Sequence, residues 1–194
     1  MTTIYLVRHG EYENPDYLFP GRSLTGFSLS ERGRSQVRHL ASYFSGKFIA
    51  AIYSSPILRC KQSAEILSER VDLPIVFDDR IQEVRTMADG VSMNLFDADP
   101  VRSYRPEFLA KGAESMTELS DRMVTFVEEK RKEYEGKEVL IVTHGDPMRF
   151  CVMKYMGLPI AFEASRAVTI PLAGGYKIEF ANDDKATVLP IKLP

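Results

Sequence analysis

The stretch Ile4-Tyr5-Leu6-Val7-Arg8-His9-Gly10-Glu11 decides how the rest of the chain is interpreted. Its first four residues are apolar and include β-branched and aromatic side chains, which is typical of a short buried strand. This strand leads directly into a guanidinium and an imidazole, at Arg8 and His9. Because a buried cation needs an anionic partner, we expect an anion to bind at the end of this strand.

A second stretch, later in the chain, repeats this pattern. The apolar run Val139-Leu140-Ile141-Val142-Thr143 is followed by His144-Gly145-Asp146. The chain has only 3 His residues, and two of them therefore stand in the same local context. The repeat predicts two strands of one sheet that deliver two imidazoles to the same edge.

Strand and helix patterns alternate through most of the chain. Helices are predicted at 30–46, 55–70, 115–134 and 146–156. Ser30 is expected to cap the first of them, and Ser55 the second, whose first helical residue would be Pro56. Strands are predicted at 4–7, 50–53, 74–77 and 139–143, followed by antiparallel strands at 168–170, 176–180 and 187–191. This order predicts an α/β fold, a three-layer sandwich whose mixed, mainly parallel sheet has helices on both faces.

Two segments show no regular period. Residues 12–28 contain several Pro and Gly residues and are predicted to be loop. Residues 85–113 are equally irregular, but an unstructured loop of that length is uncommon inside a compact domain. We therefore predict a single domain over residues 1–194, with a small irregular or helical insertion at about 85–113 that acts as a cap over the site.

The composition restricts the possible partners. Lys and Arg total 25 and Asp and Glu total 27, so the net charge of -2 predicts neither nucleic-acid binding nor binding to an anionic membrane surface. The sequence shows no secretory signal and no apolar run of membrane-spanning length. Cys60 and Cys151 fit free buried thiols in a reducing compartment, so we expect a cytoplasmic protein. The oligomeric state is left open.

The side chains at the strand ends indicate phosphate chemistry. Ligands of such sheets sit beyond the carboxyl ends of the strands, where we expect Arg8, His9, Arg59 and His144 to meet. Two guanidiniums fit the oxygens of a phosphate group, and a neutral imidazole can attack phosphorus. The adjacent guanidinium of Arg8 disfavours the charged form of His9, whereas a bound phosphate dianion would favour protonation of His144.

A phosphoryl transfer also needs a proton donor for the departing alkoxide. A carboxylic acid that is kept neutral near phosphate would serve, and Glu83, in an apolar setting just after a predicted strand, is our candidate. Glu11 and Asp146 are alternatives, because each lies two residues after a predicted site histidine. Orienting that histidine or its loop is an equally good role for either of them.

The ordered set of motifs resembles the histidine phosphatase superfamily, in its phosphoglycerate mutase-like branch. The matching pieces are Leu6-Val7-Arg8-His9-Gly10-Glu11, Leu29-Ser30-Glu31-Arg32-Gly33-Arg34-Ser35-Gln36, Ser54-Ser55-Pro56 with Arg59, Gln62, Ser63 and Ala64, Gln82-Glu83-Val84, Gly112-Ala113-Glu114-Ser115 and Val142-Thr143-His144-Gly145. They occur in the order of the family and span residues 4 to 145. An Arg-His-Gly triplet alone would be weak, but the ordered set is specific.

The resemblance implies a role for each of these groups. His9 would become a phosphohistidine, Arg8, Arg59 and His144 would hold the phosphoryl group, and Glu83 would donate the proton, with no metal and no other cofactor. Asn14, Arg22 and Ser23 are carried over as further substrate contacts. Two departures concern these three: many members have the Asn one position later, and the spacing from Gly21-Arg22-Ser23 to Leu29 is longer than usual.

We therefore expect a phosphomonoesterase that hydrolyses a small phosphorylated metabolite through a phosphohistidine. The nearest alternative is a phosphoglycerate mutase, which would need a larger cap and tail to exclude water from the site. A non-catalytic, phosphate-binding regulatory module would lack one of the core groups, and none is missing. A metallohydrolase is disfavoured because the chain has no His-x-His or His-x-x-x-His pair and because the neighbouring cations would repel a metal.

Overall fold

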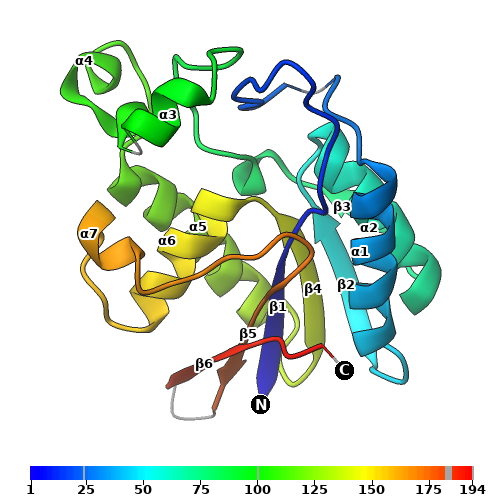
Figure 1. Cartoon of the computed structure of the whole chain (residues 1–194). Coiled ribbons are helices and arrows are strands. Elements are labelled where there is room, and N and C mark those ends of the chain that lie inside the picture. The colour runs from blue at the N-terminus through cyan, green and yellow to red at the C-terminus, as the bar shows by residue number, and fades with distance from the viewer. Residues whose placement is uncertain (24, 100, 182–184, 194) are drawn as a thin grey trace.

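A mixed β-sheet forms the centre of the computed structural model, which describes residues 1–23, 25–99, 101–181 and 185–193 (Figure 1). Its strands are β1 (Thr2–Arg8), β2 (Ile49–Ser54), β3 (Ile75–Phe77), β4 (Glu138–Thr143), β5 (Gly175–Phe180) and β6 (Ala186–Pro190). The strand order is β3-β2-β4-β1-β5-β6, with parallel pairing from β3 to β1 and antiparallel pairing from β1 to β6. The predicted mixed, mainly parallel sheet is confirmed.

Helices cover both faces of this sheet, as predicted. The long helices are α1 (Glu31–Tyr43), α2 (Leu58–Val71), α5 (Met116–Glu133) and α6 (Gly145–Tyr155). The side chains of β1 alternate between the two layers: Ile4 and Leu6 pack with α5 and α6, while Tyr5 and Val7 pack with α1 and α2. No helix of the described residues is long and apolar enough to cross a membrane.

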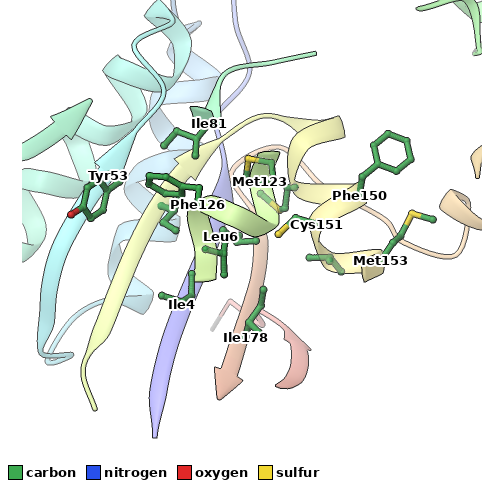
Figure 2. Close-up of a cluster of buried hydrophobic side chains, with 14 of the residues drawn as sticks. Ile4, Leu6, Tyr53, Ile81, Met123, Phe126, Phe150, Cys151, Met153 and Ile178 are labelled. Carbon is green, nitrogen blue, oxygen red and sulfur yellow. The ribbon is translucent and has the colours of Figure 1, made fainter. Parts of the chain in front are cut away.

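The larger core lies between the sheet and helices α5 and α6. Figure 2 shows Phe126 and Met123 of α5 and Cys151 of α6 gathered over Ile4 and Leu6 of the sheet. All five side chains are buried. This packing fixes α6 on the sheet and thereby positions the residues at its amino end.

One predicted strand and one predicted helix cap are wrong. Residues 168–170 form no strand: Val168 and Ile170 are buried and Thr169 is exposed, but this alternation comes from a loop that packs on the core. Helix α2 begins at Leu58, and its N-cap residue is the extended Ile57, so Ser55 does not cap it through Pro56. The hydroxyl of Ser55 instead lies 2.9 Å from Nε2 of His144.

The irregular segment at 85–113 contains short helices, as predicted. They are α3 (Asn94–Ala98) and α4 (Pro106–Leu109), with a 3₁₀ turn at Arg102–Tyr104 between them. Phe96 of α3 stacks on Phe19 of the loop at 12–28, with 4.6 Å between the ring centroids. Figure 1 shows this loop above the carboxyl end of β1, with α3 beside it over α5 and α6.

The core packing predicts a large difference between two Phe residues. Phe126 is completely buried, whereas Phe48 is 92% exposed. We expect Phe126→Ala to lower the free energy of unfolding by about 3 to 5 kcal/mol, because it leaves a cavity in the core. Phe48→Ala is the matched control and should change it by less than about 0.5 kcal/mol. Urea denaturation followed by circular dichroism measures both, and equal losses would contradict this description of the core.

Candidate active site

The parallel pairing of β1 and β4 brings two histidines together. Arg8 at the end of β1 is in register with Thr143 at the end of β4, and each is followed by a His. The rings of His9 and His144 are 5.3 Å apart between centroids, and both residues are buried. The structure thus places both imidazoles at one edge of the sheet, where the repeated pattern predicted them.

Two helices direct their amino ends at this edge. His144 is the N-cap residue of α6, and Arg59 is the second residue of α2. Unpaired backbone N–H groups and the helix dipole favour an anion at such an end. Gly145 allows the guanidinium of Arg8 to lie close to this helix end, since a Cβ atom at position 145 would lie 3.3 Å from Cζ of Arg8.

Hydrogen bonds fix the tautomer of His9. Its Nδ1 lies 2.8 Å from the carbonyl oxygen of Gly10, which can only accept, so Nδ1 carries the proton. Its Nε2 accepts a hydrogen bond of 3.2 Å from Nε of Arg59, which can only donate. The ring is therefore neutral, and the lone pair on Nε2 lies beside a guanidinium.

Burial and charge keep both imidazoles neutral. Burial, then Arg59 and then Arg8 hold the pKa of His9 well below its ordinary value. The pKa of His144 is also lowered, by burial, by Arg59 and by His9. Nε2 of His144 contacts the hydroxyl of Ser55 at 2.9 Å and Sγ of Cys60 at 3.3 Å.

The two guanidiniums are only partly satisfied by the protein. Arg8 donates from Nη1 to the carbonyl of Ile170 at 2.9 Å, and Arg59 donates from Nη2 to the carbonyl of Gly21 at 2.9 Å. In the described part of the chain, Nε of Arg8 and Nη1 of Arg59 are buried and have no hydrogen-bond partner. Unpaired buried donors are costly, and an oxyanion would satisfy both of them.

A cavity of about 150 Å³ lies at this point. It is lined by Arg8, His9, Tyr12, Phe19, Pro20, Arg59, Glu83, Met93, Gly145, Asp146 and Arg149. Sequence reasoning did not identify Tyr12, Phe19, Met93 and Arg149 as site residues. The signal for Arg149 was its place in the predicted helix after His144, whereas Phe19 and Met93 come from segments without a regular period.

Glu83 lies in this cavity as a weak acid. Its side chain is 14% exposed, and Oε2 is 4.0 Å from Nδ1 of His144. Burial, together with the nearby Asp146, raises the pKa of Glu83 to about 7, although Arg59 and Arg8 act in the opposite direction. A carboxyl group with this pKa can both donate and accept a proton near neutral pH.

The two alternative carboxylates have other partners. Glu11 accepts a hydrogen bond of 2.9 Å from Ser30 at the start of α1 and does not line the cavity. Asp146 lines the cavity, but it accepts hydrogen bonds from the hydroxyl of Tyr104 at 2.7 Å and from Nη1 of Arg149 at 2.6 Å. Both carboxylates thus accept hydrogen bonds from other side chains, whereas Glu83 accepts at Oε1 from the backbone N–H of its neighbour Val84 at 2.9 Å, which favours Glu83 as the acid.

The structure does not bring the three further substrate contacts into the cavity. Asn14 bonds to the backbone of Leu18 through both its amide oxygen and its amide nitrogen. Ser23 donates its hydroxyl to the carbonyl of Thr25. Arg22 donates from Nε to the carbonyl of Glu83 at 2.7 Å. Their roles as substrate contacts stay predictions.

Arg22 belongs to a partly buried network that contacts the backbone beside Glu83. Its Nη2 donates to Oε2 of Glu114 at 3.1 Å, and Arg122 donates to the same carboxylate from Nε at 2.7 Å and from Nη2 at 2.9 Å. Arg122 also donates from Nη1 to the carbonyl of Gln82 at 3.2 Å. Glu114 therefore binds both Arg22 and Arg122, and each of these arginines donates to a backbone carbonyl at Gln82 or Glu83.

This network predicts a pH-dependent loss of stability in Glu114→Gln. Burial raises the pKa of Glu114, but Arg122 outweighs it, so the pKa is lowered overall. A lowered pKa means that this carboxylate stabilises the fold at neutral pH and that its contribution is lost as the pH falls. We expect Glu114→Gln to cost about 2 kcal/mol at pH 7, because it leaves two arginines without a counter-charge.

Chemical denaturation at several pH values tests this expectation. The difference between Glu114→Gln and the wild-type protein should stay nearly constant down to about pH 5 and shrink as the pH falls through about 4 and below, because the carboxylate is protonated first in the unfolded chain and only at lower pH in the folded protein. Glu65→Gln, at an exposed position of α2, is the matched control and should behave like the wild type. A pH-independent difference would contradict the ionic role of Glu114.

In residues 1–23, 25–99, 101–181 and 185–193, no group of three or more His, Cys, Asp or Glu side chains could hold a metal ion.

Known proteins are similar to this chain in both sequence and fold. The chain is 32% identical to the "Uncharacterized phosphatase PhoE" of Bacillus subtilis (strain 168), covering 94% of this chain and 91% of the relative. It is 30% identical to "Phosphoserine phosphatase 1" of Hydrogenobacter thermophilus, covering 83% and 79%. The solved structure of Bacillus stearothermophilus YhfR superposes with a TM-score of 0.80 at 25% identity, covering 98% and 96%. The model of the histidine phosphatase superfamily (branch 1) matches residues 4–190, and the chain belongs to this family.

Proposed function

We propose that this protein is a phosphomonoesterase that hydrolyses a small phosphorylated metabolite through a phosphohistidine at His9. The observation that supports this most strongly is the neutral His9 ring, whose unprotonated Nε2 lies in a cavity together with the guanidiniums of Arg8 and Arg59. A nucleophile and two phosphate-binding cations are thus in contact range of one ligand. The family to which the chain belongs supports the same reaction.

In the first half of the reaction, Nε2 of His9 attacks phosphorus. A P–N bond forms while the P–O bond to the alcohol breaks, and Glu83 gives its proton to the departing alkoxide. The unpaired N–H groups of Arg8 and Arg59 bind the equatorial oxygens, where negative charge is held during transfer. The dianion also favours a protonated His144, which then donates a further hydrogen bond.

In the second half, water attacks the phosphohistidine. Glu83, now a carboxylate, takes the proton of this water as the O–P bond forms and the P–N bond breaks. Inorganic phosphate leaves, and His9 and Glu83 return to their initial states. A pKa near 7 suits Glu83 to both steps, since the same group must donate a proton first and accept one afterwards.

The segment at 85–113 is proposed to be a cap over this site in a single-domain protein. Its Met93 lines the cavity, and its Phe96 stacks on Phe19, which also lines the cavity. Such a cover would restrict the entry of water, which is what a phosphoglycerate mutase would need in order to return the phosphoryl group to an alcohol. The mutase reaction is therefore the second candidate, and adding 3-phosphoglycerate with a bisphosphate primer distinguishes the two.

The proposed reaction needs neither a metal nor another cofactor, and its partner is a small phosphate ester rather than nucleic acid or a membrane. A name among the relatives, phosphoserine phosphatase, supports a small substrate. The cytoplasmic location stays a prediction, and it is consistent with the free, buried thiols of Cys60 and Cys151.

A phosphoenzyme assay tests the proposed function. The protein is incubated with a generic phosphate monoester and quenched, and we expect a phosphoprotein that is stable to base and labile to acid. His9→Ala should abolish both the phosphoprotein and turnover, whereas His39→Ala, at an exposed position of α1, is the matched control and should retain both. Chelators should have no effect. Turnover that persists in His9→Ala would exclude the assigned nucleophile, and binding of phosphate without turnover would favour a regulatory module.

The pKa of Glu83 predicts the pH profile. Because the donor must be protonated, kcat/KM should fall as the pH rises above about 7, the value to which burial raises this pKa. Glu83→Gln should remove this alkaline limb and lower kcat/KM for an alkyl phosphate by about 10² to 10⁴. The loss should be much smaller for para-nitrophenyl phosphate, whose leaving group needs no proton. An equal loss on both esters would contradict the role of Glu83 as the acid, and Asp146 would then be tested in the same way.

A further inference from the structure

A second, larger cavity adjoins the active site. Its volume is about 480 Å³, and it shares Asp146 and Arg149 with the first cavity. The other residues that line it are Tyr104, Phe150, Phe162, Ser165, Arg166, Val168, Thr169 and Ile170. A hydrogen bond joins the two walls, because Arg8 of the first cavity donates to the carbonyl of Ile170. The paired side chains of Asp146 and Arg149 thus form the rim between the cavities.

The volumes indicate how a substrate would be divided between them. The first cavity, at about 150 Å³, is well below the roughly 300 to 1,000 Å³ of typical small-molecule sites. It has room for the phosphoryl group and the nearest atoms of the ester beside Glu83. A larger alcohol would extend beyond it, and the second cavity shares the rim formed by Asp146 and Arg149.

The walls of the second cavity favour an apolar body. Tyr104 and Phe162 contribute partly exposed aromatic rings, whereas Phe150, Val168 and Ile170 line the cavity from the core and are almost completely buried. Figure 1 shows α7 (Phe162–Ser165), which carries Phe162, on the outer side of α6, which carries Phe150. Aromatic walls on two elements suit a ring or chain that lies between them.

The charges of this cavity favour an anionic group at a distance from the ester. Arg149 is held by Asp146 at 2.6 Å, so the rim is nearly neutral, and the carboxylate there would repel a second carboxylate. The guanidinium of Arg166 lies 5.6 Å from the centre of the Phe162 ring and makes no ion pair with any described carboxylate. Its donors are therefore available to an anion at the far side of the cavity.

We infer that the second cavity binds the alcohol part of the substrate, and that this alcohol has an aromatic or aliphatic body with a distal anionic group, such as a carboxylate, that Arg166 binds. The inference rests on the proposed phosphatase function. It assigns Phe162 and Arg166 as residues that determine specificity, whereas the phosphoryl group is bound by the residues of the first cavity.

Two matched esters test this inference. Phenyl phosphate and para-(carboxymethyl)phenyl phosphate have similar leaving groups and differ in the distal carboxylate. We expect kcat/KM to be about five-fold higher for the carboxylate ester, the size of a partly exposed charge-assisted hydrogen bond, and Arg166→Gln to abolish this preference. Arg38→Gln, at an exposed position of α1, is the matched control and should keep the preference. Phe162→Ala should lower kcat/KM for both aryl esters relative to glycerol phosphate.

The outcomes separate the inference from the proposed function. Equal kcat/KM values for the two aryl esters in the wild-type protein, or a preference that survives Arg166→Gln, would overturn the assignment of the second cavity. In either of these cases turnover and the phosphoprotein would still be observed. Absence of turnover on every ester, without a phosphoprotein, would instead overturn the phosphomonoesterase itself.

Discussion

The site contains two guanidiniums whose buried N–H donors are not all paired within the described part of the protein. Arg8 and Arg59 are placed against two buried imidazoles, and one donor of each guanidinium has no partner among the described residues. Burying cations in this way costs free energy unless an anion completes the site. The surrounding structure offsets this cost elsewhere: α5 and α6 bury a continuous apolar core on one face of the sheet, and α1 and α2 bury another.

The same arrangement assigns different chemistry to groups that lie close together. The cations and the burial keep His9 neutral, and the carbonyl of Gly10 orients its ring so that Nε2 is unprotonated. Burial shifts the pKa of Glu83 in the opposite direction, because it disfavours a carboxylate and so raises this pKa to about 7. An unprotonated imidazole nitrogen and a carboxyl group that titrates near neutral pH therefore lie in one cavity of about 150 Å³.

Much of the fold and of the candidate site could be predicted from sequence, because strand ends and local motifs determine them. The apolar runs before His9 and His144 predicted two strands with a common edge, and their parallel pairing follows from the alternation of strands and helices. Predictions from local sequence patterns were wrong where tertiary contacts determine the conformation. Val168 and Ile170 alternate like a strand but pack as a loop, and Ser55 contacts His144 although its position before Pro56 resembles a cap. Arg22 donates directly to the carbonyl of Glu83 and is held there by Glu114, a contact across 92 residues that no local pattern reveals.

We propose that Nε2 of His9 is the atom that receives the phosphoryl group. The most direct measurement is phosphorus-31 and nitrogen-15 NMR of the trapped phosphoenzyme, in a protein whose histidines carry nitrogen-15. Because the carbonyl of Gly10 holds the proton on Nδ1, we expect phosphorus coupled to Nε2 of His9. Phosphorus on Nδ1 of His9, on His144 or on any other residue would contradict it.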